Sequence, residues 1–574
     1  MTEAKPRIEQ FIDNVQLICN KPNALKWITI LPLVLFSPSL FFGLVSDDYF
    51  QYWNIHYNPS INSPLDLALS MFAFIPNGIP GFNELMPWWL NDRFSLSFFR
   101  PISVLTHWLD SVLWPHAFFL HHLHSLVWAC LCVLVVHKVY NRVIRTGWLA
   151  VMCTLLFSVQ DSHAFANGWL ANRNANVAFV FGMLALDTHI RSRTEQRSLL
   201  LPVSLVLLSL LSAEAGLCTM AFIGSWALLY EKNLKSSIKS LVPYAIVVVS
   251  WRLVYKAMGY GADGLTMYAD PITSPTLFIE KVLNNIPLLL VNQWYKFPVE
   301  TVFGLPQSLR AVPAVIGFIS LIPLAVMFAP VIRKHKVLQF WALSMVIALI
   351  PVCAVFPMER LLLFSGVGAI GLLAGLIQHH SGALIKWLLF LHLPIAMLLC
   401  PLKTMTVKLQ DVFLIGYDSL PSDMSSTSHI FYLNGLEFVP PYTTTLMHIN
   451  KVKTPEGMHL FSPAPEANIT RIDDYTFEMT LASGWFERGA IVTTPPKEFH
   501  VGEQNTTPEF SVDVMAVTID GQPSRLRYTM RDRLDHPDYR WMIWRGLHYE
   551  EIDLMFEIGK PKHFENPTSK MFQA

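Results

Sequence analysis

Long apolar runs set the fold class of this chain. A helix needs about twenty apolar residues to cross the hydrocarbon core of a bilayer. The stretch Leu199–Tyr230 is too long for one helix and is interrupted by Ser212–Gly216, so we expect two short spans that meet at Glu214. With the single runs, this predicts a polytopic α-helical membrane protein of about eleven spans within residues 25–402. The single runs are Leu25–Val45, Phe118–Tyr140, Gly147–Ala164, Ala175–Ile190, Leu241–Met258, Leu309–Ile332, Leu338–Phe356, Leu361–Ile377 and Leu384–Leu402.

The distribution of charge supports this class and argues against a nucleic-acid partner. The chain is 52% hydrophobic and only 15% charged, whereas soluble domains are about one quarter charged. Residues 1–400 carry 26 basic and 19 acidic side chains, and residues 401–574 carry 16 and 23. The membrane part is therefore slightly basic and the tail slightly acidic, with no separate basic stripe that would bind nucleic acid.

Lysine and arginine predict the orientation, because they are enriched in short cytoplasmic loops. Alternate loops are basic and the others are poor in positive charge. The N-terminus, residues 1–24, then lies in the cytoplasm, and an odd number of spans places the tail outside; we expect a bacterial inner membrane with a periplasmic tail. The basic positions are Arg142, Arg145, Arg191, Arg193, Arg197, Lys232, Lys235, Lys239, Arg333, Lys334 and Lys336.

Two long outer loops and the tail complete the organisation. The loops, 46–117 and 259–308, contain amphipathic or short apolar stretches that we expect to lie along the membrane surface. A linker, 403–428, precedes a small extracytoplasmic β-rich domain, 429–574. Strand-like runs begin at Ile430, Tyr475, Phe510 and Arg540, and Asp520-Gly521 is a turn signal.

Two adjacent carboxylates, Asp47 and Asp48, stand at the outer end of the first span. One could take a proton from an acceptor hydroxyl as a general base while the other positions a substrate or a cation. Desolvation and mutual repulsion would raise one pKa into a useful range. The alternative is a polar stop at the end of a helix, and from spacing alone the two interpretations are evenly balanced.

The segment Arg100–Asp110 places Ser103, His107 and Asp110 on one helical face. This face either lines a cavity or lies in water on a surface helix. A second polar group, which includes Asp161, His163 and Arg173, crowds the short connection between two spans. Since a helix start electrostatically favours anions, Arg173 there suggests a bound anion; the alternative is a side chain that extends to the lipid headgroups.

Glu214 and Arg360 are the remaining candidates. Glu214 is an ionisable residue at the tip of two half-spans, which makes it a functional candidate, although it could equally cap a tight turn. Arg360 begins a span beside Glu359, with which it could form a local ion pair of little energetic value. In the predicted topology all of these candidate residues lie on the outer side, whereas scattered structural polar residues would divide between both sides.

No metal site is predicted from the sequence. His121, His122 and His124 stand where the second span begins, but their spacing does not place two of them at i, i+4 on one helix face. The cysteines have no metal-ligand spacing, and the tail contains none. No cofactor is assigned, and a divalent cation is left open.

At these positions the chain resembles the GT-C superfamily of membrane glycosyltransferases, in particular the membrane part of tetratricopeptide-repeat-containing O-mannosyltransferases and their bacterial relatives. The resemblance covers roughly residues 25–380, and no tetratricopeptide repeats are present. It departs at Phe165, where the family often has an acidic residue; either Asp161 substitutes or the second acid is absent. The matching segments are Asp47-Asp48, Arg100-Pro101-Ile-Ser-Val-Leu-Thr, His121-His122-Leu123, Leu156-Phe157 followed by His163, Trp169-Leu-Ala-Asn-Arg173, Ser212-Ala213-Glu214 and Glu359-Arg360-Leu361-Leu362.

The resemblance implies an outward-facing cavity, a polyprenyl-phosphate-linked sugar as donor, and inverting transfer to a glycan, lipid or protein acceptor. By that resemblance Asp47 is the base with Asp48 assisting, Arg173 and Arg360 hold the lipid phosphate, and His163 and Glu214 orient them; Arg100, His107 and Asp161 belong to the same site. Two alternatives remain open: a transporter or flippase for a lipid-linked saccharide, and a non-catalytic membrane scaffold with an outer binding domain.

Overall fold

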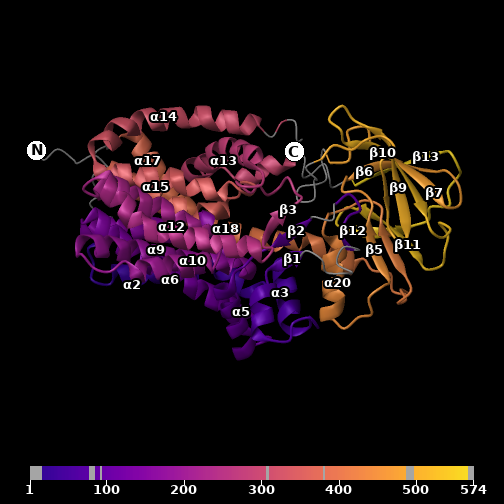
Figure 1. Ribbon diagram of the computed structural model, residues 1–574, viewed down its shortest axis with the longest axis horizontal. Helices are drawn as coiled ribbons and strands as arrows, with labels where there is room; N and C mark the ends of the chain where they lie inside the picture. The colour runs from indigo at the N-terminus through magenta and orange to yellow at the C-terminus, as the bar shows by residue number, and fades with distance from the viewer. Residues whose placement is uncertain are drawn as a thin grey trace, which may run out of the picture.

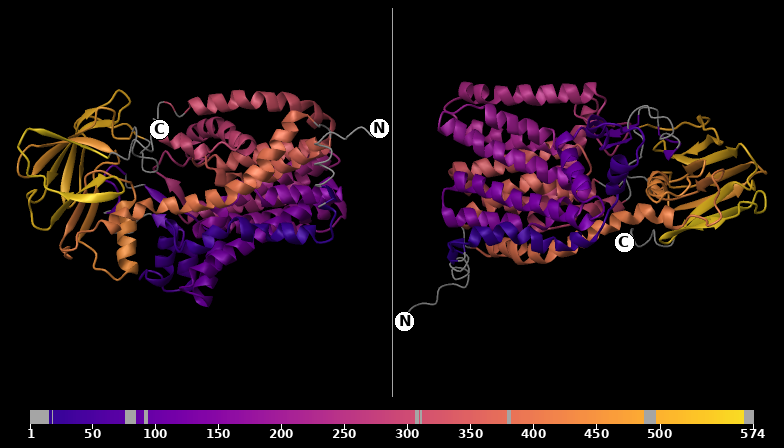
Figure 2. Two further views of the ribbon diagram at one scale, coloured as in Figure 1. Left: turned by 180° about the vertical axis from the view of Figure 1, so that it is seen from behind. Right: turned by 90° about the horizontal axis from the view of Figure 1, so that it is seen from below.

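The computed structural model describes residues 16–17, 19–75, 85–90, 94–305, 309, 311–378, 382–486 and 497–566. The chain is mostly helical, at 59%, and ends in a β-rich region. Figure 1 shows a bundle of long helices that run side by side, with the β-rich domain at one end of the bundle. Short outer helices and a small sheet lie between the two parts (Figures 1 and 2).

Five helices in the described part of the chain are long and apolar enough to cross a membrane. They are α6 (Phe118–Ile144), α12 (Leu234–Ala257), α14 (Val312–Lys334), η8 with α16 (Glu359–Ile377), and the continuous helix Ala383–Asp418. A sixth is possible by length if α7 (Gly147–Ser158) and the segment Asp161–Gly168, which are bent by 52°, form one span. These helices are typical of a multi-pass membrane protein.

Shorter helices fill the rest of the bundle. Four of them are apolar: α2 (Ala24–Leu35), α10 (Leu200–Leu210), η5 with α11 (Glu214–Tyr230) and α15 (Lys336–Val352). The predicted interruption of the 199–230 stretch is confirmed, since α10 ends before Glu214. The 22-residue α9 (Arg173–Thr194) carries many polar side chains and is largely buried against α6 and α10.

Glycines allow α16 to pack closely against α15. A Cβ atom at Gly371 of α16 would lie 2.5 Å from the Trp341 ring of α15. Small residues of this kind let helix backbones approach within a membrane. Trp341 and most of α16 are fully buried as a result.

The two long outer loops fold together. The first contains α3 (Asp47–His56), α4 (Pro64–Ser70), β1 (Ala73–Ile75), β2 (Ser95–Ser97) and α5 (Pro101–Leu113); the second contains β3 (Gly261–Asp263), α13 (Pro275–Tyr295) and η6 (Val299–Gly304). Strands β1, β2 and β3 form one antiparallel sheet, so the two loops are joined by backbone hydrogen bonds.

The last helical segment continues through the region expected to be a linker. Elements α17 (Ala383–Phe390), η9 (Leu391–Ile395), α18 (Ala396–Thr406), η10 (Val407–Leu414) and α19 (Ile415–Asp418) follow one another without a break. Of the expected linker 403–428, only the part after Asp418 lies outside this helix. The C-terminal domain is therefore connected to the bundle by a helix.

The C-terminal domain has two sheets around one hydrophobic core, and the strand-like runs predicted at 430, 475, 510 and 540 are all strands. A six-stranded sheet has the order β13-β6-β7-β10-β9-β8, and a four-stranded sheet has the order β12-β11-β4-β5. Helix α20 (Val439–Ile449) lies between β4 and β5 and packs on α3. The strands are β4 (His429–Tyr432), β5 (Gly457–Leu460), β6 (Glu466–Arg471), β7 (Thr476–Thr480), β8 (Gln504–Thr506), β9 (Phe510–Val517), β10 (Pro523–Met530), β11 (Tyr539–Arg545), β12 (His548–Ile552) and β13 (Pro561–Glu565).

Candidate functional site

A cavity of about 710 Å³ lies where the bundle, the outer loops and the C-terminal domain meet. Its lining residues come from α3, β1 to β3, α12, α15, η8, α16 and α20, elements that are far apart in sequence. Part of the wall is apolar and belongs to helices of the bundle, including Val248 of α12, Ile350 of α15 and Phe364 of α16. The charged lining residues are Asp47, Arg100, Glu214, Arg252, Asp270 and Arg360.

Asp47 is a half-buried carboxylate at the start of α3, facing the cavity. Ser46, which precedes it, has a φ of 49°, a conformation that L-residues rarely adopt and that clusters at functional sites. The hydroxyl of Tyr442, on α20, donates a hydrogen bond to Asp47 Oδ1 at 2.6 Å. Burial raises the pKa of Asp47, opposed by this hydrogen bond and by the positive charges of Arg360 and Arg100.

Asp48 faces away from the cavity lining. Its carboxylate accepts hydrogen bonds from the backbone N–H groups of Ala171, at 2.6 Å, and Val45, at 3.0 Å, and the residue is only 2% exposed. Burial raises the pKa of Asp48 well above its ordinary value, while the two backbone donors lower it. The adjacent acids are thus separated in space: Asp47 is open to a ligand, and Asp48 joins α3 to η4 (Leu170–Asn172).

Arg360 is the cation in the cavity that has no acidic partner. Its guanidinium stacks on the Trp169 ring at 5.4 Å, and within the described residues it has no hydrogen bond and no ion pair. A half-buried guanidinium in this state has donors available for an anion. Its neighbour Glu359 points elsewhere, so the local ion pair considered from the sequence does not form.

Arg100 and Glu214 form an ion pair in the cavity wall. The Arg100 Nη2 atom lies 2.6 Å from Glu214 Oε2, and the guanidinium stacks over Phe98 at 4.3 Å. Tyr255 of α12 donates a further hydrogen bond to Glu214, to Oε1 at 3.2 Å. The Glu214 carboxylate therefore orients the Arg100 guanidinium, at the junction between the two short helices α10 and α11.

Arg173, by contrast, is completely buried and neutralised. Its Nη1 atom lies 2.5 Å from Asp110 Oδ2, and the guanidinium also donates to the His121 carbonyl at 2.8 Å and to Ser125 Oγ at 2.7 Å. His124 pairs with the other oxygen of Asp110 at 2.6 Å. Arg173 does not line the cavity, and Asp110 accounts for a cation at this helix start.

His107 and the predicted polar face of α5 are buried in protein. His107 is 5% exposed and packs edge-on against Phe72. Burial and the positive charge of Arg173 hold its pKa well below the ordinary value, so the ring is neutral. Ser103 and Asp110, on the same face, are also buried, which excludes a face lying in water.

Asp161 belongs to a largely buried group of charges that does not line the cavity, which we call the buried ion cluster: Asp161, Lys296, Glu359 and Lys403. Asp161 lies 2.7 Å from both lysine Nζ atoms, and Lys403 also pairs with Glu359. Asp161, Glu359 and Lys296 are 1%, 3% and 9% exposed. His163 packs against Phe157 nearby, with ring centroids 4.6 Å apart, and neither His163 nor Asp161 lines the cavity.

The three neighbouring histidines bind separate protein groups. His121 lies 3.0 Å from the Trp114 carbonyl, His122 2.8 Å from the Gly43 carbonyl, and His124 pairs with Asp110. In the described part of the chain, the only group of side chains with metal-ligand spacing is in the C-terminal domain. The divalent cation left open from the sequence therefore has no cluster of ligands at the cavity among these residues.

Four residues predicted from the sequence lie together in the cavity: Asp47, Arg100, Glu214 and Arg360. The sequence analysis did not predict Tyr442. Tyr442 lies 395 positions from Asp47, in a domain expected to be β-rich, and no local pattern marks it. The comparisons add no assignment: neither protein-family models nor curated proteins match this chain.

Proposed function

We propose that this protein is a membrane glycosyltransferase that transfers a sugar from a polyprenyl-phosphate-linked donor to an acceptor on the extracytoplasmic side. One observation carries the proposal: a carboxylate, Asp47, and an unpaired guanidinium, Arg360, line a cavity whose walls include the apolar sides of long helices. A base, an anion-binding group and a lipid-compatible wall are what this reaction requires. The resemblance to GT-C enzymes agrees with this arrangement.

The proposed topology has eleven crossings. The five long apolar helices, the bent pair, the four shorter apolar helices and α9 correspond in order to the apolar runs of the sequence. Basic positions support one cytoplasmic end: Arg142 of α6 pairs with Asp187 of α9, and Arg193 pairs with Glu231 after α11. The C-terminal domain then lies outside, in the periplasm if the membrane is a bacterial inner membrane.

The proposed chemistry is a single displacement. Asp47 removes the proton from the acceptor hydroxyl, whose oxygen bonds to the anomeric carbon as the bond from that carbon to the phosphate oxygen breaks. The phosphate leaves with the electron pair, and Arg360 and Arg100 stabilise its charge. A single displacement inverts the anomeric centre. Asp48 contributes by holding the start of α3, and Glu214 by holding Arg100.

The two sides of the cavity suit the two substrates. Apolar residues of α12, α15 and α16 could accept the polyprenyl chain from the membrane. The lining residues Phe438, Pro441 and Tyr442 come from the C-terminal domain, so this domain would bound the acceptor.

The test is a transfer assay with purified protein and a radiolabelled polyprenyl-phosphate sugar, in detergent and in liposomes. The transferase is expected to release the polyprenyl phosphate and to lose this activity in Asp47→Asn but not in the control Asp66→Asn, an acid of α4 outside the cavity lining. Movement of labelled lipid across liposomes without release would instead identify a flippase, and no activity in either assay would favour a scaffold.

A further inference from the structure

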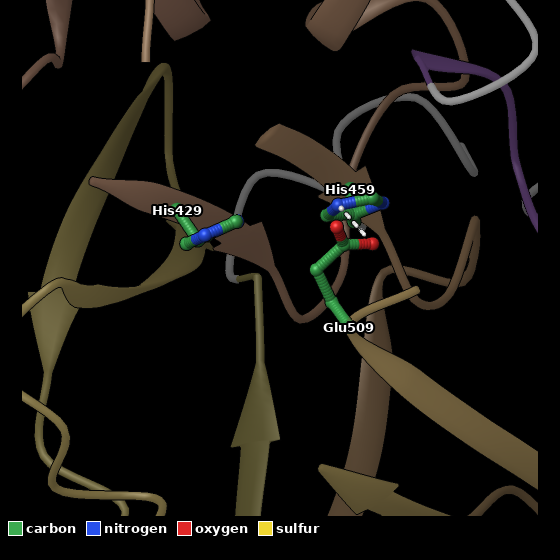
Figure 3. Close-up of side chains that lie close together, drawn as sticks. All are labelled: His429, His459 and Glu509. Atoms are coloured by element: carbon green, nitrogen blue, oxygen red, sulfur yellow. Dashed lines mark ion pairs between the residues drawn. The ribbon is translucent and has the colours of Figure 1, made fainter. Parts of the chain in front are cut away.

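The C-terminal domain contains a second group of side chains that could bind a ligand, and none of them lines the cavity. His429, His459 and Glu509 each present one ligand atom, and these atoms lie within 4.8 Å of one another. Figure 3 shows the three side chains converging, with His459 and Glu509 in contact. The Nε2 atom of His459 lies 3.4 Å from a Glu509 carboxylate oxygen.

The strand register places the two histidines on one face of the four-stranded sheet. His429 on β4 is directly paired with Gly457 on β5, and His459 follows Gly457 by two positions. Side chains two positions apart on a strand point to the same face. A side chain at position 457 would stand between the two rings, and glycine leaves that space open.

The open space is bounded by nitrogen atoms. A Cβ atom at Gly457 would lie 2.8 Å from His459 Nε2 and 2.9 Å from His429 Nδ1. Both nitrogens are buried and have no hydrogen-bond partner within the described residues, in residues that are only 5% and 3% exposed. Buried polar atoms normally have partners, so two such nitrogens around one space point to a ligand.

We propose that His429, His459 and Glu509 bind a divalent cation of the zinc class, and that the cation joins the two sheets of the C-terminal domain. Two imidazoles and one carboxylate form a known zinc-binding set, with a further position for water. At zinc–ligand distances of 2.0–2.2 Å, tetrahedral ligand atoms are about 3.3–3.5 Å apart. The 3.4 Å between His459 and Glu509 already has this value.

The surrounding residues suit a metal site. The other nitrogen of His429, Nε2, lies 3.7 Å from the Glu456 carboxylate. Carboxylates that hold the far nitrogen of a metal-bound histidine orient the ring and make it more basic.

The position of the ligands indicates a structural role. His429 and His459 belong to the four-stranded sheet, whereas Glu509 immediately precedes β9 of the six-stranded sheet. A cation held by all three would cross-link the two layers. It would also fix β4 and β5, the strands that flank α20, and this inference does not depend on the proposed transferase activity.

The experiment uses the full chain purified in detergent without a polyhistidine tag, stripped with a chelator and titrated with Zn²⁺ against a chromophoric competitor. We expect one high-affinity Zn²⁺ per chain for the wild type and for the control His548→Gln, an exposed histidine on β12. Affinity should fall at least about 100-fold in His459→Gln and about 10-fold in Glu456→Gln, since even outer partners of metal ligands contribute 10- to 100-fold. Gly457→Ala should also abolish tight binding, although it removes no ligand.

A second measurement guards against misfolded variants. Zn²⁺ should raise the melting temperature of the wild type and of His548→Gln but not of Glu509→Gln, which keeps the size of the side chain. Circular dichroism establishes that each titrated variant is folded. Failure of the wild type to bind Zn²⁺ stoichiometrically, or equal affinity in the wild type and in folded His459→Gln or Glu509→Gln, would overturn the proposal.

Discussion

Two adjacent residues of η8, Glu359 and Arg360, belong to two different charged regions of this protein. Glu359 enters the buried ion cluster, where each carboxylate is matched by a lysine. Arg360 lines the same cavity as Asp47, and among the described residues no acid pairs with it. The same residue types therefore have opposite consequences: mutually satisfied charges stabilise the structure, and unsatisfied ones are available to a substrate.

The largest expected effect is a loss of transfer activity on substitution of a residue that lines the cavity. Asp47→Asn keeps the size of the side chain but removes the proton acceptor, so transfer should fall about 10²- to 10⁴-fold, the usual contribution of a general base. The melting temperature should change little, because Asp47 is half-buried and bonded only by Tyr442 among the described side chains. Transfer assays and thermal denaturation in detergent measure the two quantities. If Asp48→Asn abolished transfer while Asp47→Asn did not, the assignment of the base would be reversed.

The buried ion cluster should show the opposite behaviour. Asp161→Asn leaves Lys296 and Lys403 with too little negative charge in a buried place, and breaking one member of a buried ion pair costs about 3–5 kcal/mol. We therefore expect a lower denaturation midpoint and a normal transfer rate per folded molecule, with Asp66→Asn, a partly exposed acid outside the cluster, as the control. A stable Asp161→Asn protein without transfer activity would remove the distinction between the two regions.

The two arginines predicted to hold phosphate sharpen the comparison. Arg360→Ala should weaken binding of a polyprenyl phosphate about ten- to hundred-fold, because a hydrogen bond to a charged group contributes about 1.5–3 kcal/mol. Arg360→Lys should restore affinity only partly, since lysine lacks the planar fork. Arg173→Met should instead lower stability, as it leaves Asp110 without its guanidinium. A binding titration in which only Arg173→Met loses affinity would contradict the role given to Arg360.

The sequence identified the charged residues of the site, but it did not show which groups each of them contacts. Apolar runs located the apolar helices of the bundle, because hydrophobicity along one segment is a local property. They did not locate α13, which the sequence analysis placed in an outer loop and which packs against α14 and α15. The interruption at Glu214 and the strands of the tail were likewise visible locally. The division between Asp47 and Asp48 was not, because it depends on Ala171 and Tyr442, which approach from distant segments. Arg173 was predicted to bind phosphate because the acid that pairs with it, Asp110, lies 63 positions earlier in the chain, and the sequence does not show that the two residues meet.

The smallest expected effect concerns the contact between the two parts of the molecule. Burial raises the pKa of Tyr442 well above its ordinary value, so this hydroxyl stays protonated and donates to Asp47. Tyr442→Phe removes a donor that favours the ionised carboxylate and should raise the pKa of Asp47 further.

The direction of the pH effect separates positioning from general damage. A base acts when ionised, so transfer is lost as the pH falls through the pKa of Asp47. In Tyr442→Phe this loss should begin at higher pH, while activity at high pH should stay near that of the wild type and of Tyr475→Phe, an exposed control in the same domain. A profile of kcat/KM against pH makes the distinction. An equal loss at every pH would mean that Tyr442 only supports packing of α20 on α3, and that the C-terminal domain leaves the proposed base unaffected.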